Sequence, residues 1–226
     1  MQDTIYKMMN LVPVAWNERI QFECHHCGAC CRNIKESVPL ESLDVYRIAK
    51  LLKEQNNVFD SIDAMLFWYA VPIPLNECGY FIYALKTVGE NDACIFLKDN
   101  LCTIQTAKPR ACRTYPLAAE PNGDASFNYY LSIEKPHHFA GRKFKARDWM
   151  RRYFTQEDQT FLNTDLSKLS EIAELLRQIP AVRKPEALLY FLKFKYTDFD
   201  LDQPFMPQYE ENTEELKRIL QNIVGR

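Results

Sequence analysis

The stretch that decides the fold runs from Phe22 to Arg32 and reads Phe-Glu-Cys-His-His-Cys-Gly-Ala-Cys-Cys-Arg. Its cysteines stand at positions 24, 27, 30 and 31, so that two Cys-x-x-Cys pairs share Cys27. A Cys-x-x-Cys turn lets two thiolates converge on one metal centre, and thiolates favour zinc, copper(I) and iron–sulfur clusters. Gly28 suits such a turn because it lacks a Cβ and adopts positive φ freely. The stretch therefore predicts a thiolate metal centre.

The adjacent cysteines Cys30 and Cys31 are harder to place on one ion. Neighbouring side chains point to opposite faces of an extended chain and splay widely on a helix. This pair therefore favours a polynuclear cluster or two neighbouring centres.

Composition bounds the class of protein. The 226 residues suffice for one sizeable domain, and 47% hydrophobic with 26% charged residues is typical of a globular protein. A net charge of −2 gives no indication of nucleic acid or an anionic membrane as a partner. Residues 1–20 lack the pattern of a secretory signal, so we expect a cytoplasmic protein, in which the cysteines are metal ligands rather than disulfides.

The hydrophobic pattern predicts an α+β fold, with a small sheet, cysteine-rich loops and a helical C-terminal part. We expect residues 1–145 to form the metal-binding region, and residues 146–226 to be helical and packed on it as one domain. Expected elements are helices near 40–55 and 60–70, strands at 79–87, 93–98 and 127–133, and a surface loop at 198–211.

A second group of cysteines lies between Cys94 and Pro116. The chain there reads Cys-Ile-Phe-Leu-Lys-Asp-Asn-Leu-Cys-Thr-Ile, then Lys-Pro-Arg-Ala-Cys-Arg-Thr-Tyr-Pro, which places thiols at 94, 102 and 112. These loops can bring three more thiolates to the first stretch. Arg113 either donates to a cluster sulfur or lies at the surface.

The two groups together resemble the bacterial cysteine-cluster proteins, which are described as a zinc- or iron-chelating domain and include the flagellin lysine-N-methylase. The resemblance covers roughly residues 20 to 145 and implies a metal or iron–sulfur site. Carried onto this chain, the implied ligands are Cys24, Cys27, Cys30, Cys31, Cys94, Cys102 and Cys112.

The chain departs from this family at one place. Relatives carry a further Cys-Pro-Gly motif, where this sequence reads Lys-Pro-His-His-Phe-Ala-Gly from Lys135 to Gly141. Histidine can replace the cysteine, with His138 preferred to His137; a structural histidine pair is the alternative. We expect Cys78 to pack as a small hydrophobic residue without binding metal.

Several other residues have a simpler interpretation. His25 and His26 lie between the first two ligands and are expected beside the site or exposed. The basic run 142–152 could bind an acidic peptide or phosphate, but a solvated helix face accounts for it more simply.

The metal identity remains a choice between two chemistries. Cys24, Cys27, Cys30 and the remote Cys112 approximate ferredoxin ligation, while zinc fits the same spacings. The adjacent cysteines favour a cluster, of 4Fe–4S type, over zinc.

Three functions follow from these motifs. The first is a metal-binding protein in redox or metal handling, and the second is a methylase-like enzyme that modifies a protein or peptide. The third is a structural zinc module for protein interactions. An open coordination position would distinguish the enzyme from the module, because structural zinc sites are closed.

Overall fold

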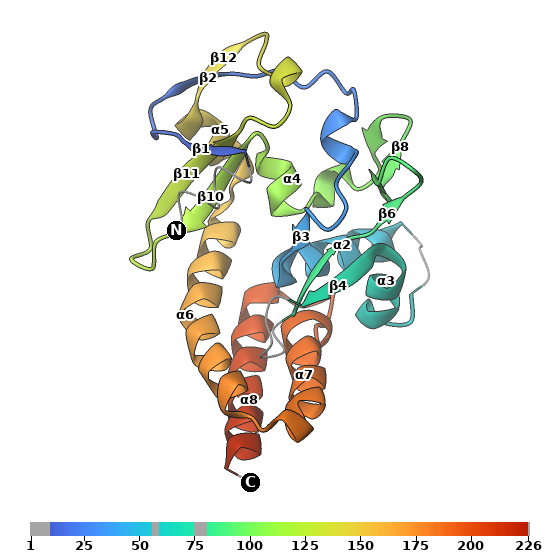
Figure 1. Cartoon of the computed structure of the whole chain (residues 1–226), viewed down its shortest axis with the longest axis vertical. Helices are drawn as coiled ribbons and strands as arrows, with labels where there is room; N and C mark the ends of the chain where they lie inside the picture. Colours follow the sequence, from blue (N-terminus) through green and yellow to red (C-terminus); the bar gives the residue numbers. More distant parts are fainter. Residues whose placement is uncertain (1–9, 56–58, 75–80, 226) are drawn as a thin grey trace.

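The computed structural model describes residues 10–55, 59–74 and 81–225 (Figure 1). Short antiparallel strands and cysteine-bearing loops form one end of the molecule, and long helices form the other. The predicted α+β class is confirmed.

The sheets at the cysteine-bearing end join residues that are far apart in sequence. Val12 pairs with Leu131 in the first sheet, and Ile20 pairs with Phe144 in the second. The N-terminal arm is thereby fixed against the segment that follows the last cysteine. The first sheet has the order β1 (Leu11–Pro13), β11 (Phe127–Ser132) and β10 (Leu117–Pro121); the second pairs β2 (Arg19–Gln21) with β12 (Lys143–Lys145).

A largely buried helix packs against the segment between Cys102 and Cys112. Helix α2 (Ser42–Glu54) corresponds to the helix expected near 40–55; it carries an apolar stripe, and its Val45 and Ile48 are almost completely buried. Helix α3 (Ile62–Tyr69) packs against α2 and leads into a three-stranded sheet. That sheet has the order β3 (Pro39–Leu40), β5 (Phe81–Leu85) and β4 (Ala70–Pro74).

The expected single strand at 93–98 is wrong, because the chain makes two small hairpins there. Asp99 and Asn100 both adopt positive φ in the tight turn of the second hairpin, a conformation that Asp and Asn tolerate better than most residues. The hairpins pair β6 (Thr87–Val88) with β7 (Ala93–Cys94) and β8 (Leu97–Lys98) with β9 (Leu101–Cys102). A 3-10 turn η2 (Gln105–Ala107) and helix α4 (Arg110–Thr114) follow.

The helical end is built from α6, α7 and α8, which pack along one another (Figure 1). The expected surface loop at 198–211 is wrong in its second half, because α8 begins at Phe205; Pro207 falls in the first turn, where proline is tolerated. The elements are α5 (Ala146–Tyr153), α6 (Gln156–Gln178), the 3-10 turn η4 (Ala181–Arg183), α7 (Lys184–Leu192), the π-helical turn η5 (Lys193–Thr197) and α8 (Phe205–Val224).

Buried apolar side chains are continuous between the two ends. The core includes Leu43 of α2 and Met150 of α5, together with Phe161, Phe191 and Leu220 of the long helices. In the ranges described, no helix has the length and apolar character needed to cross a membrane.

Candidate metal centre

The cysteine-rich loop lies between β2 and the 3-10 turn η1 (Ala29–Cys31). Gly28 precedes this turn with a φ of 69°, where a side chain would be strained and its Cβ would collide with the Arg32 guanidinium. Arg32 donates to the Cys27 carbonyl oxygen at 3.0 Å and to Asn100 Oδ1 at 2.5 Å. The loop is thereby tied to the β8–β9 hairpin.

Four thiols from separate segments come together beside this loop. Cys30 lies in η1, Cys94 ends β7, Cys102 ends β9, and Cys112 lies within α4. Each thiol in the set of Cys30, Cys94, Cys102 and Cys112 interacts electrostatically with every other. Cys31 interacts with three of them, namely Cys30, Cys94 and Cys112. These five thiols therefore lie near enough to one another for each ionised thiolate to disfavour ionisation of its neighbours.

The adjacent cysteines Cys30 and Cys31 face the same side. Their Sγ atoms are 3.8 Å apart, contrary to the expectation that the chain directs them away from each other. The reason is the tight 3-10 turn, to which the alternation of an extended strand does not apply. A hydrogen bond from Cys31 lowers the pKa of Cys30 to about 6, and the same hydrogen bond raises the pKa of Cys31.

Burial and mutual repulsion oppose ionisation of the other thiols. Burial raises the pKa of Cys94 to about 11, and burial also raises the pKa values of Cys102 and Cys112. Lys108 opposes this rise at Cys102 and stabilises the Cys30 thiolate. A cation bound among these thiols would offset the free-energy cost of ionising them, because it stabilises the thiolate form.

A second group combines one cysteine with two histidines. Cys27 Sγ lies 3.2 Å from His138 Nε2 and 3.8 Å from His137 Nε2, and the three atoms lie within 4.8 Å of one another. The His138 side chain is buried and its Nδ1 lies 2.9 Å from the Tyr115 hydroxyl. The Phe22 ring packs edge-on against both His138 and Tyr115. These residues have the chemistry and spacing of a metal site.

The remaining expected residues lie around these groups. Cys24 is exposed and does not belong to the Cys27–His137–His138 group, although its charge is felt at Tyr115. His25 is exposed and repels a charged His138, and His26 is exposed with a φ of 51°. Cys78 lies outside the described residues.

Arginines fix the helix that carries Cys112. Arg113 donates to Asp158 Oδ1 at 2.7 Å and to the Tyr153 carbonyl oxygen at 3.1 Å, so its guanidinium holds α4 against α5 and α6. Arg47 of α2 donates to the same Asp158 oxygen at 2.6 Å. Arg110 makes two hydrogen bonds to the Glu41 carboxylate, at 2.6 and 2.8 Å.

Sequence reasoning missed Tyr115, Lys108 and the Arg32–Asn100 contact. Tyr115 lies in the motif that ends Cys-Arg-x-Tyr-Pro, which was a signal that it belongs to the site. The position of Lys108 and the contact between Arg32 and Asn100 depend on how the hairpins fold back onto the first loop, and local sequence carries no signal for either.

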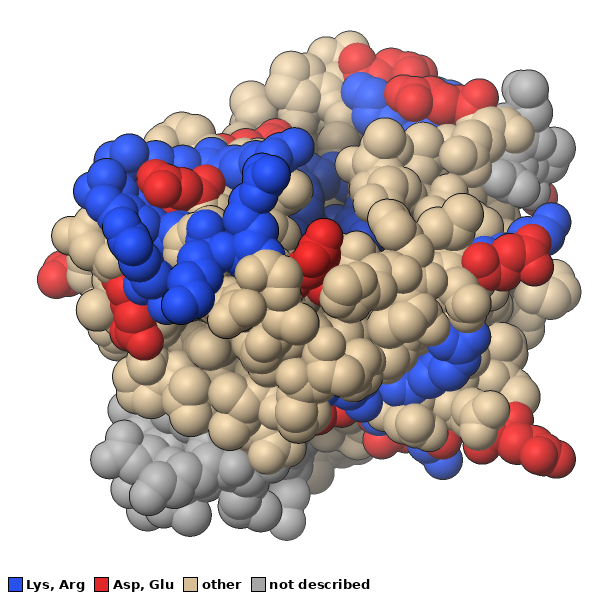
Figure 2. Space-filling view, turned by 90° about the horizontal axis from the view of Figure 1, so that it is seen from above, with Lys and Arg blue, Asp and Glu red and all other residues tan. Residues whose placement is uncertain are grey.

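The basic run 142–152 does not form a single helix face. Arg142, which precedes β12, and Lys143, which begins it, are exposed, whereas Arg147 of α5 donates to Asn17 Oδ1 at 2.9 Å. Figure 2, which views the molecule from above, shows Lys and Arg side chains gathered on the left, the side on which β12 and α5 lie in Figure 1.

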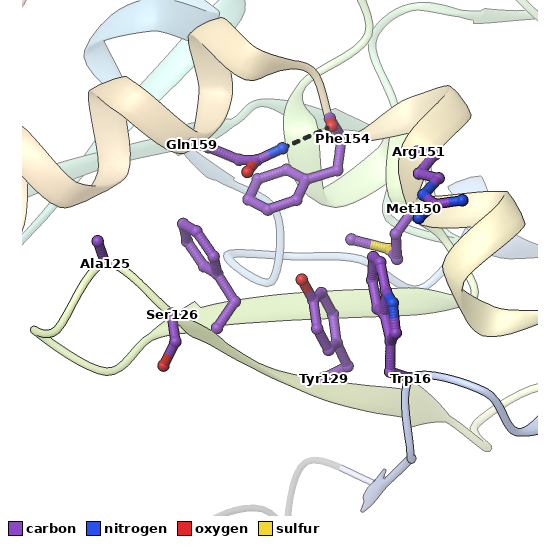
Figure 3. A pocket seen from close by; sticks show the side chains of 9 residues that line it. Trp16, Ala125, Ser126, Tyr129, Met150, Arg151, Phe154 and Gln159 are labelled. Carbon is purple, nitrogen blue, oxygen red and sulfur yellow. Dashed lines mark hydrogen bonds between the residues drawn. The ribbon is translucent and has the colours of Figure 1, made fainter.

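A separate cavity of about 440 Å³ lies between the β10–β11 hairpin and α5 (Figure 3). Trp16, Tyr129 and Phe154 project into it, and the Trp16 and Tyr129 ring centroids are 4.9 Å apart. Its lining contains neither cysteine nor histidine.

Comparison with known proteins identifies the family. No curated protein and no solved structure matches the chain. A family model named CxxCxxCC, with the description "Putative zinc- or iron-chelating domain", matches residues 23–148, which is more than half of the chain. The matched range contains both groups of cysteines, at 24–31 and 94–112, and the two histidines His137 and His138. Metal chelation is therefore the property that the sequence family and the side-chain geometry share. The chain belongs to the CxxCxxCC family of zinc- or iron-chelating domains.

Proposed function

We propose that the chain is a cytosolic metal-binding protein that carries a 4Fe–4S cluster and serves in electron transfer or metal handling. The observation that supports this most is the set of four thiols, Cys30, Cys94, Cys102 and Cys112, in which each interacts with every other. Four cysteine thiolates are the ordinary ligand set of such a cluster.

A cluster suits these side chains better than a single zinc ion. Zinc in structural sites takes four ligands, whereas Cys31 adds a fifth thiol 3.8 Å from Cys30. A cluster contains several iron atoms and sulfides. An additional thiol can therefore either bind an iron atom or donate a hydrogen bond to a sulfide. Cys94 is buried and Cys102 and Cys112 are half-buried, so three of the four ligands would shield the cluster from solvent, whereas Cys30 is exposed.

The test is purification without oxygen. The protein should be brown and contain iron and acid-labile sulfide. Cys94→Ser and Cys112→Ser should lose both, whereas Cys78→Ser should keep them. Colourless protein with stoichiometric zinc would overturn the proposal and favour a zinc module for protein interactions.

A second candidate function is a metal-dependent enzyme that modifies a protein or peptide, as the resemblance to the methylase implies. The exposure of Cys27 and His137 favours it, because a metal held there would be accessible to a large substrate. Incubation of the metal-loaded protein with peptides, followed by mass spectrometry, tests this function. Unchanged peptide masses would exclude modification of the peptides used.

A further inference from the structure

We propose that Cys27, His137 and His138 hold a single zinc or iron(II) ion in a centre of its own, with one coordination position open to an exogenous ligand. This inference does not depend on the iron–sulfur cluster, because the three residues are distinct from the four thiols assigned to it.

The spacing of the three donor atoms supports one ion. Cys27 Sγ lies 3.2 Å from His138 Nε2 and 3.8 Å from His137 Nε2, and donor atoms about 2.0–2.3 Å from one tetrahedral zinc ion are separated by roughly 3.5 Å. One thiolate with two imidazoles suits zinc or iron(II), and hard cations prefer oxygen ligands instead.

Tyr115 orients the buried ligand. Its hydroxyl lies 2.9 Å from His138 Nδ1, on the side of the ring opposite Cys27. When Nδ1 carries the proton and donates to this hydroxyl, the Nε2 lone pair faces Cys27, where the ion would bind. Partners of this kind fix the tautomer of metal-binding histidines, and their loss lowers metal affinity 10- to 100-fold.

The backbone fixes the two segments that supply the ligands. Glu23 N–H donates to the His138 carbonyl oxygen at 3.2 Å, and Phe22 N–H donates to the Arg142 carbonyl oxygen at 3.3 Å. Arg32 holds the Cys27 carbonyl oxygen from the other direction. The ligands therefore come from a supported site rather than from free loops.

The open position follows from what surrounds the three atoms. Over the ranges that the structure describes, no fourth His, Cys, Asp or Glu joins the group. Cys27 and His137 are also exposed, so a small molecule can approach from solvent. Three protein ligands with one open position are characteristic of catalytic rather than structural zinc sites.

The test uses zinc added without oxygen to the full chain purified with its iron–sulfur cluster, so that the four cluster thiols are already occupied, followed by zinc analysis and zinc K-edge X-ray absorption. We expect one zinc bound by one sulfur and two imidazoles, and added bromide should enter the coordination shell. Tyr115→Phe, which keeps the ring, should weaken zinc binding 10- to 100-fold.

Matched variants separate this centre from the cluster. Cys27→Ser and His137→Ala should lose the zinc but keep iron and sulfide, whereas Cys112→Ser should lose iron and keep zinc. His26→Ala, in an exposed histidine of the same loop, should keep both. Loss of iron from Cys27→Ser would overturn the inference by assigning Cys27 to the cluster. Two sulfurs in the zinc shell, unaffected by bromide, would overturn the open position and identify Cys24 as a closing ligand.

Discussion

At the scale of single residues, the conformation of Gly28 determines where the first thiols point. Its φ of 69° turns the chain between Cys27 and Cys30, and the absence of a Cβ leaves space for the Arg32 guanidinium. Cys27 consequently faces the histidines, while Cys30 faces the thiols of the hairpins.

Gly28→Ala should therefore damage metal binding as well as stability. A side chain in the left-handed region is destabilising by about 1–2 kcal/mol, and the alanine methyl would also displace Arg32 from Cys27. Gly89→Ala is a matched control, since Gly89 has a φ of 72° but open space around the Cβ position. Thermal unfolding should show similar losses for both, and metal analysis should show loss only for Gly28→Ala. Equal metal content would exclude a role for Arg32.

The sequence indicated which cysteines and histidines could form the site, but not that they separate into a four-thiol group and a group of Cys27, His137 and His138. The spacing of cysteines predicted that distant thiols meet the Cys-x-x-Cys loop, since loops of that length can return to it. The 3-10 turn that aligns Cys30 with Cys31, and the hydrogen bond from Tyr115 to His138, depend on long-range packing that no local pattern records.

At the scale of elements, one buried carboxylate joins three helices. Asp158 at the start of α6 pairs with Arg47 of α2 and Arg113 of α4, and only 1% of its side chain is exposed. Burial disfavours its charged form, yet the two arginines outweigh burial and hold the pKa of Asp158 below its usual range.

Asp158→Asn should destabilise the protein by roughly 3 kcal/mol, because it leaves two partly buried guanidinium groups without their carboxylate. Because the folded-state pKa is depressed, the carboxyl stabilises the fold above about pH 4 and this contribution is lost as pH falls below that value. Urea unfolding between pH 5 and pH 2 should show a shallower pH dependence for the variant.

Glu157→Gln provides the comparison for this prediction. Glu157 also contacts Arg47, but its side chain is 46% exposed, so the change should alter stability by less than about 1 kcal/mol. Equal effects of the two substitutions would mean that Asp158 does not carry the network.

Hydrophobic periodicity predicted α2 and the helical C-terminal part, because α2 and α8 each present an apolar face to the core. Short elements were less predictable. Two-residue strands have no alternation to detect, and the Asp99–Asn100 turn was the only local indication of a hairpin. The start of α8 was not predicted because acidic residues and Pro207 there are equally typical of a surface loop.

At the scale of the whole molecule, order at the two ends has different sources. The helical end buries large side chains such as Phe161, Phe191 and Leu220, whereas the cysteine loops consist of short strands around thiols. Metal binding at such loops is coupled to folding.

Removal of metal by a chelator should therefore increase amide hydrogen exchange in residues 22–36 and 92–116. Protection of α6 and α8 should be retained, since their packing does not involve the thiols. Exchange followed by mass spectrometry measures both regions in one sample. Uniform protection before and after chelation would show that the loops fold without metal.

The chain order of the ligands has a consequence for biosynthesis. Cys27 and Cys30 emerge from the ribosome early, Cys112 follows much later, and His138 comes last. Neither of the two proposed centres could close while only the N-terminal loop has been translated, so the nascent thiols would depend on the reductants of the cell until their partners arrive. Under this ligand assignment, metal would be delivered late in the life of each newly made chain, and a translational pause before residue 112 would prolong the interval in which these thiols are exposed to oxidation.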